Sequence, residues 1–210
     1  MTELVFILDR SGSMSGLEND TIGGFNSMLK KQKAESGEAY VTTVLFDNYV
    51  EILHDRLPLH TVSSITEKEY FVRGSTALLD AVGSTIQHIA RIHKYAHSDH
   101  KPEKTLFVII TDGMENASRK FTYEKVNRLI THEQEKYGWE FLFLGSNIDV
   151  AAEGARLGIP EAHTAEYLTN CAGISLNYDV ISDAVTELRA CRPIAENWKD
   201  KIDNNRRKHR

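Results

Sequence analysis

The sequence predicts a single α/β domain with a doubly wound, mostly parallel β-sheet, one antiparallel edge strand and helices on both faces, a Rossmann-like arrangement. Two observations lead to this prediction. Short continuous apolar segments alternate with segments of helical periodicity, and the 210 residues suffice for one well-packed domain but not for two ordinary ones. We expect the domain to span residues 1–192, and residues 193–210 to form a flexible basic tail.

Three short apolar segments are predicted to be buried strands, because runs this short and rich in Val, Ile and Phe are typical of strands covered on both faces. Tyr40–Phe46 and Tyr49–Leu53 flank the turn Asp47-Asn48, which predicts a β-hairpin and thus an antiparallel edge. A last, shorter strand is expected at His163–Tyr167. The three buried segments are Leu4–Leu8, Leu106–Ile110 and Phe141–Leu144.

Apolar residues at steps of three and four predict helices between and after these strands. A further short helix follows Asn147 and reaches Leu157, where Gly158 and then Pro160 end it. The periodic groups are Ile22, Phe25 and Leu29; Leu79, Val82, Ile86 and Ile89; Val126, Leu129 and Ile130; and Ile174, Tyr178, Ile181, Val185 and Leu188.

Composition and charge narrow the classes of function. The net charge of −5 argues against a surface that binds nucleic acid, although it leaves room for a local basic patch. Cys171 and Cys191 would lie too far apart along one helix to form a disulfide, and free thiols suit a reducing compartment. No signal peptide and no segment of membrane-spanning length is recognised. We therefore expect a cytoplasmic protein that binds neither nucleic acid nor membranes.

Polar side chains gather where the predicted strands end. Asp9, Ser11 and Ser13 follow the first buried strand, and Asp112 follows the second. Thr76 comes just before a predicted helix. In an open α/β sheet, ligands bind at the carboxyl ends of the strands, near the point where the strand order reverses. We therefore expect these residues to meet at the carboxyl ends of the strands.

Two carboxylates and three hydroxyls at one place favour a hard divalent cation. Mg²⁺ and Mn²⁺ prefer about six oxygen ligands, whereas the thiolate and imidazole ligands typical of zinc are missing from these loops. Two carboxylates only balance the charge of the ion, which leaves it attractive to one more anionic oxygen. The sequence therefore predicts a cation-dependent module that binds an Asp or Glu carboxylate of a partner protein.

The order Asp9-x-Ser11-x-Ser13, then Thr76, then Asp112 resembles the metal-ion-dependent adhesion site (MIDAS) of von Willebrand factor A (vWA) domains. The resemblance implies that the hydroxyls of Ser11, Ser13 and Thr76 bind the ion. It also implies that Asp9 and Asp112 act directly or through bound water, and that a partner carboxylate fills the remaining position.

The resemblance covers roughly residues 1–191, since the hairpin and the order of helices also fit. It further implies a possible regulatory movement of the last predicted helix, around Ala172–Cys191, when the metal is bound. The alternative is a magnesium-dependent phosphoryl hydrolase or transferase of the haloacid dehalogenase type. Such an enzyme needs a second carboxylate two positions after Asp9, where this chain has Ser11, so we predict no enzymatic activity.

Several residues beside the proposed site have two interpretations. Arg10 and Met14 could touch a partner or pack internally. Glu115 and Asn116 could line the site or lie in a solvated loop. Asn147 and Asp149 could contact a partner, or one of them could cap the following helix.

Overall fold

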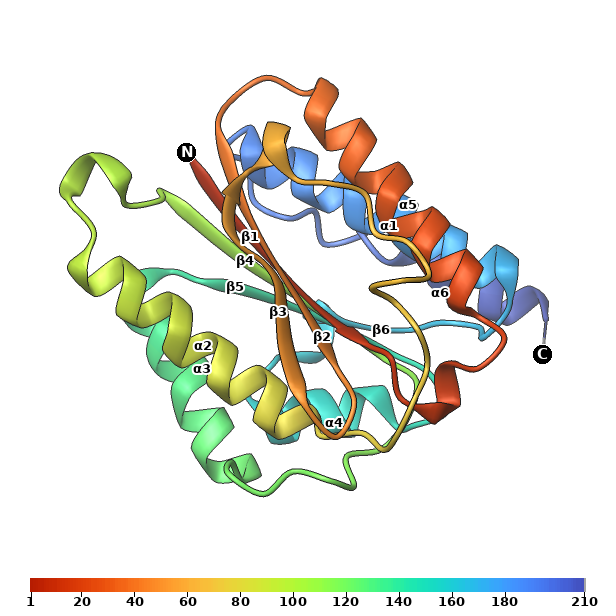
Figure 1. The fold of residues 1–210 in the computed structure, drawn as a ribbon. Coiled ribbons are helices and arrows are strands. Elements are labelled where there is room, and N and C mark those ends of the chain that lie inside the picture. The colour runs from red at the N-terminus through yellow and green to blue at the C-terminus, as the bar shows by residue number, and fades with distance from the viewer. Residues whose placement is uncertain (210) are drawn as a thin grey trace.

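A computed structural model describes residues 1–209, in which a six-stranded sheet lies between two layers of helices (Figure 1). The strands are β1 (Thr2–Asp9), β2 (Ala39–Phe46), β3 (Val50–Pro58), β4 (Lys104–Thr111), β5 (Glu140–Gly145) and β6 (Thr164–Glu166). They lie in the order β3-β2-β1-β4-β5-β6, and only the β2–β3 pair is antiparallel. This confirms the predicted fold class, including the hairpin at the edge.

Helices cover both faces of the sheet, as Figure 1 shows. The helices are α1 (Glu18–Ala34), α2 (Leu78–Tyr95), α3 (Tyr123–Tyr137), α4 (Val150–Leu157), α5 (Cys171–Arg189) and α6 (Asp200–Lys208). Helices α1, α5 and α6 lie on one face, and α2, α3 and α4 lie on the other. Four short 3₁₀ helices connect them: η1 (Gly12–Met14), η2 (Leu59–Thr61), η3 (Ser98–His100) and η4 (Glu161–His163).

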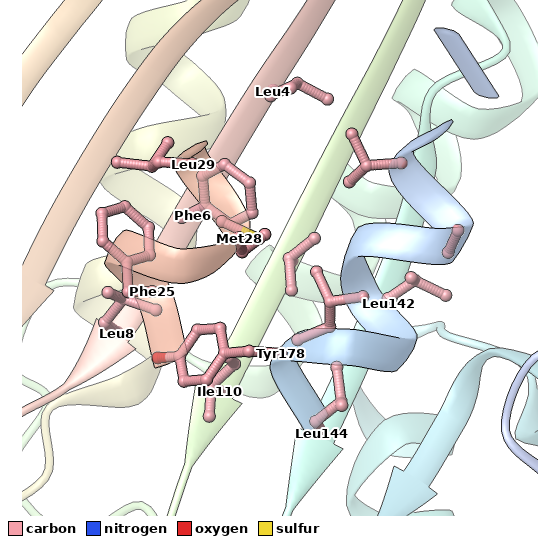
Figure 2. Close-up of a cluster of buried hydrophobic side chains, with 14 of the residues drawn as sticks. Leu4, Phe6, Leu8, Phe25, Met28, Leu29, Ile110, Leu142, Leu144 and Tyr178 are labelled. Atoms are coloured by element: carbon pink, nitrogen blue, oxygen red, sulfur yellow. The ribbon is translucent and has the colours of Figure 1, made fainter. Parts of the chain in front are cut away.

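Alternate residues of β1 belong to opposite hydrophobic cores. Phe6 packs edge-on against Phe25 of α1, with ring centroids 5.5 Å apart, and Tyr178 of α5 completes this part of the core (Figure 2). Ile7, the next residue, lies in the second core with residues of α2, α3 and α4. Because both faces of the strand are buried, its sequence is continuously apolar rather than alternating.

The C-terminal segment differs from the flexible tail expected for residues 193–210. Residues 200–208 form α6, and Trp198 and Ile202 are buried in the core beside α5. The Trp198 indole donates a hydrogen bond of 2.8 Å to the carbonyl of Ala162. Two apolar residues among many charged ones give too weak a periodicity to predict this docking. Arg210 lies outside the described residues.

Two further expectations concern the environment of the protein. Within residues 1–209, no helix combines the length and the apolar character needed to cross a membrane. Cys171 begins α5 and Cys191 follows it, and both are free, exposed thiols, as expected from their spacing.

Candidate metal site

The candidate site lies where the order of the sheet reverses. From β1 the chain returns through α1 to β2 on one side, whereas β4 leads through α3 to β5 on the other. The loops after β1 and β4 therefore diverge and leave a crevice at the carboxyl ends of the two strands. Asp9 ends β1 and Asp112 directly follows β4; both are at least 98% buried.

Three distant segments meet in this crevice, two of which bring hydroxyls and the third a carboxylate. The Oγ atoms of Ser11 and Ser13 lie 3.2 Å apart. The Thr76 hydroxyl, 65 residues along the chain, donates a hydrogen bond of 3.0 Å to Ser11 Oγ. The backbone N–H of Asp112 donates to Asp9 Oδ2 at 3.3 Å, which ties the third segment to the first. The five residues expected at the carboxyl ends of the strands thus lie together.

Close backbone approach makes this arrangement possible. The N–H of Gly12 donates to the carbonyl of Gly74 at 3.0 Å, which joins the first loop to the segment before Thr76. Gly74 has a φ of +67°, and a Cβ there would lie 2.0 Å from Asn48 Oδ1, so a larger residue would be strained and would displace the Asn48 side chain. A Cβ on Gly113 would lie 3.2 Å from Ser13 Oγ, which shows how closely the third loop covers the serines.

Glu115 and Asn116 lie in the loop after β4, and both brace the Thr76 segment. The Asn116 side chain accepts from the Thr76 N–H at 2.9 Å, and the Asn116 N–H donates to the Thr76 carbonyl at 3.0 Å. Glu115 Oε2 accepts from the N–H of Leu79 at 2.9 Å, in the first turn of α2. These contacts fix the threonine at the position from which its hydroxyl meets Ser11.

The two carboxylates are buried without a cationic partner. Asp9 accepts hydrogen bonds of 2.7 Å from the Ser11 N–H and from the Thr111 hydroxyl, yet burial raises its pKa above the usual value. Burial also raises the pKa of Asp112 to about 6, although Asn147 donates to its Oδ1. Neither carboxylate forms an ion pair with a Lys, Arg or His among residues 1–209. A bound cation would remove this electrostatic penalty, so the residues fit a metal ion.

Arg10 is a structural residue rather than an exposed contact for a partner. It is completely buried, and its guanidinium donates to Asp47 at 3.0 Å, to Glu51 at 2.6 Å and to the carbonyl of Glu69 at 3.1 Å. Arg73 donates to the same Asp47 oxygen at 2.7 Å. Burial tends to raise the pKa of Asp47, but the hydrogen bonds from Arg73 and Arg10 hold it below its usual value. Both arginines thus share the carboxylate of Asp47, and neither is left without an acidic partner.

The other residues with two interpretations also have defined positions. Met14 is buried, which agrees with internal packing. Asp149 caps α4, since its side chain accepts from the Ala152 N–H at 3.0 Å. Asn147 lies at the edge of the site, with a φ of +58° and its amide on Asp112. Asparagine tolerates this left-handed conformation better than most residues.

Two buried tyrosines that the sequence did not single out hold the backbone beneath the carboxylates. The Tyr70 hydroxyl donates to the carbonyl of Asp9 at 2.5 Å, and the Tyr167 hydroxyl donates to the carbonyl of Thr111 at 3.2 Å. The tyrosines come from segments 61 and 56 residues away from their partners, so no local pattern reveals them.

The set of ligands differs from a cluster of His, Cys and acidic residues. Within residues 1–209, no three or more such side chains are arranged to hold a metal ion. The candidate site instead combines two carboxylates with three hydroxyls, which is the oxygen chemistry suited to Mg²⁺ and Mn²⁺.

Comparisons with known proteins bear on the fold. No protein-family model matches the sequence, and no curated protein matches it. Among solved structures, the chain is similar to a von Willebrand factor type A protein from Catenulispora acidiphila, with a TM-score of 0.59 and 15% identity over 88% of this chain and 42% of that one. It is also similar to a D319A mutant of the PilB minor pilin from Streptococcus sanguinis, with a TM-score of 0.61 and 14% identity over 94% of this chain and 62% of that one.

A third similar structure is proximal thread matrix protein 1 from the mussel byssus, solved with a zinc-occupied MIDAS motif. Its TM-score is 0.60, with 13% identity over 88% of this chain and 46% of that one. The chain thus spans less than two thirds of the length of each of the three. At these identities the similarity shows the fold: this protein has a vWA-like α/β fold.

Proposed function

We propose that this protein is a divalent-cation-dependent protein-binding module. In this proposal Asp9, Ser11, Ser13, Thr76 and Asp112 hold one Mg²⁺ or Mn²⁺ ion, and the ion holds a carboxylate of a partner protein. The main support is the meeting of three hydroxyls and two buried, unpaired carboxylates at the point where the sheet order reverses. Further support comes from the vWA-like fold, which is shared with a protein whose structure has a zinc-occupied MIDAS motif.

The residues of the site explain why the partner should be acidic. The bound ion supplies two positive charges, and Asp9 and Asp112 together supply two negative ones, so the site has no excess negative charge to repel a further carboxylate. The three hydroxyls are neutral donors that add no further charge. An acidic side chain is therefore favoured over a neutral one, most strongly where the surroundings are partly dry.

We also propose that the site catalyses no reaction. A phosphotransferase that used Asp9 as nucleophile would need a carboxylate at the position of Ser11 to act as acid and base. The Ser11 hydroxyl is instead hydrogen-bonded to Thr76. The free thiols at Cys171 and Cys191 favour a reducing compartment such as the cytoplasm.

Calorimetric titration of Mg²⁺ and Mn²⁺ into metal-free protein tests the first part of the proposal. Binding should occur in the wild type and be lost in Asp112→Ala. Asp149→Asn is the matched control, because it neutralises a nearby exposed carboxylate while asparagine still caps α4. Unchanged binding in Asp112→Ala would contradict the proposal.

The second part is tested by affinity capture from a cell extract with and without a chelator. A partner of this site should be captured by the wild type and Asp149→Asn in Mg²⁺, and be lost with chelator or in Asp112→Ala. Replacing the acidic residue of that partner by its amide should abolish capture. Capture that ignores both the chelator and Asp112→Ala would contradict a metal-bridged interaction.

A further inference from the structure

A second concave region lies at the amino ends of the strands, opposite the candidate metal site. A cavity of about 690 Å³ is formed between the C-terminal ends of α2 and α3 and the segment that leads into β4. Thr105 at the start of β4 lines it, whereas Asp112 follows the end of this strand, so the two sites lie roughly 20 Å apart at 3.3 Å per residue. The volume is in the range of small-molecule pockets. We call this region the α2–α3 cavity.

A rigid aromatic surface forms part of the α2–α3 cavity. At its base lies Trp139, which is only 5% exposed because it stacks on Phe107 at 5.2 Å and His93 packs edge-on against it at 5.3 Å. Tyr95 and Tyr137 also line the cavity and are 77% and 57% exposed. Such rings provide flat faces against which a planar ligand can pack at low cost in side-chain entropy.

Cationic side chains outnumber acidic ones around these rings, although the whole chain carries a net charge of −5. Lys94 Nζ lies 5.5 Å from the ring of Tyr95, and Lys136 Nζ lies 5.2 Å from the ring of Tyr137. The cavity therefore places positive charge beside aromatic rings, which suits a ligand with an anionic group attached to a planar one. The charged lining residues are Arg91, Lys94, Lys101 and Lys136, against Glu103 and Glu133.

One of the acidic lining residues, Glu133, has a carboxylate oxygen without a donor within residues 1–209, which favours a ligand that carries N–H groups. Glu133 is buried, and its Oε1 lies 3.2 Å from His132 Nδ1. Its Oε2 has no hydrogen-bond partner among the described residues. A buried carboxylate oxygen without a donor is unfavourable, and an amino or ring N–H group beside Glu133 would supply that donor. A nucleobase carries such groups, whereas a simple aromatic acid does not.

We propose that the α2–α3 cavity binds a mononucleotide, with its base beside the exposed rings of Tyr95 and Tyr137 and its phosphate near Lys94 and Lys136. The volume accommodates one nucleotide, and the negative charge of the whole chain disfavours a long polyanion. None of the five residues of the proposed metal site lines this cavity, so the two proposals stand or fall separately.

Fluorescence titration with AMP tests this proposal. The chain has two tryptophans, so Trp198→Phe leaves Trp139 as the single reporter. Measurements in EDTA exclude binding through a metal ion. We expect saturable quenching by AMP with a dissociation constant below about 1 mM, and at least about tenfold weaker binding of adenosine and of inorganic phosphate, since each lacks one half of the contacts.

Variants locate the site. The double variant Lys94→Ala, Lys136→Ala should bind AMP at least about tenfold more weakly, and both lysines are exposed, so the fold should persist. The matched control Lys30→Ala, Lys68→Ala removes two exposed lysines outside the cavity and should bind AMP normally. Equal AMP affinity in the two double variants, or equal affinity for AMP and adenosine, would overturn the proposal. Tighter binding of a twelve-residue oligothymidylate than of AMP would also overturn it, because it would indicate an extended nucleic-acid surface.

Discussion

Asp112→Asn is expected to stabilise the metal-free protein at pH 7.5 and to abolish its stabilisation by Mg²⁺. The carboxylate of Asp112 is only 2% exposed and has no cationic partner in the part of the chain that the structure describes. Asparagine removes the buried charge but keeps an oxygen that can accept the hydrogen bond from Asn147. The substitution therefore removes an electrostatic penalty with little change in shape.

The pKa of Asp112 gives the size and the pH dependence of this effect. In the metal-free folded protein the pKa is about 6, against about 3.9 for an aspartate in an unfolded chain. Below about pH 3 the group is protonated in both states and contributes nothing. Between about pH 3 and pH 6 the unfolded chain ionises first, so the free energy of unfolding falls as the pH rises. Above pH 7 the loss reaches about 3 kcal/mol, at 1.36 kcal/mol per unit of pKa.

Thermal unfolding in EDTA at pH 4.0 and pH 7.5 measures this. At pH 7.5 the variant should melt roughly 6–12 °C above the wild type, since 1 kcal/mol shifts Tm by about 2–4 °C in a chain of this size. At pH 4.0, where the penalty is only about 0.5 kcal/mol, the two should melt within about 2 °C of each other. Mg²⁺ at a hundred times its Kd should stabilise the wild type by about 2.7 kcal/mol and leave the variant unchanged. Asp149→Asn controls for the loss of an exposed carboxylate and should follow the wild type in both buffers.

Two results would refute this reasoning. If Asp112→Asn destabilised the metal-free protein at pH 7.5, the buried carboxylate would be satisfied by contacts that the amide cannot make. If the difference in Tm were the same at pH 4.0 and pH 7.5, its origin would not be the ionisation of Asp112.

Three further substitutions test the support of the site. Tyr70→Phe should lower the free energy of unfolding by about 1–2 kcal/mol in urea, because the carbonyl of Asp9 loses its donor in a buried place. Asp47→Ala should cost about 3–5 kcal/mol in the same assay, because it leaves the buried guanidinium of Arg10 without its closest buried carboxylate. Gly113→Ala should weaken Mg²⁺ binding in calorimetry by about tenfold, because the new methyl group would crowd the serine and threonine hydroxyls of the site.

The predictions for Asp47→Ala and Gly113→Ala each have a result that would contradict them. Glu51→Ala also removes a carboxylate paired with Arg10, but Glu51 is 50% exposed, so its loss should cost less than about 1 kcal/mol. Equal losses for Asp47→Ala and Glu51→Ala would contradict the role given to burial. Normal Mg²⁺ affinity in Gly113→Ala would mean that the metal does not lie beside this loop.

The sequence predicted the framework of the fold because its strands are buried on both faces. Leu4–Leu8 and Leu106–Ile110 are apolar without interruption, and the strand ends follow directly. Since the carboxyl ends of parallel strands lie on the same side of the sheet, the sequence alone could place Asp9 and Asp112 together.

The supporting contacts could not be predicted, because they join residues without a local pattern. Tyr70 lies in an irregular segment and meets Asp9 only through the fold. Arg10 follows a strand and has the polarity of an exposed residue, but Asp47 and Arg73 build a buried ion-pair network around it. In α6, the apolar contacts come from Trp198 and Ile202, too few to give a periodic signal.

Anomalous diffraction from crystals soaked in Mn²⁺ tests the central claim most directly. We expect one strong peak within bonding distance of the hydroxyls of Ser11, Ser13 and Thr76, and no peak there in crystals of Asp112→Ala. A manganese peak only elsewhere on the protein, or no peak at saturating Mn²⁺, would contradict a cation site at the carboxyl ends of β1 and β4.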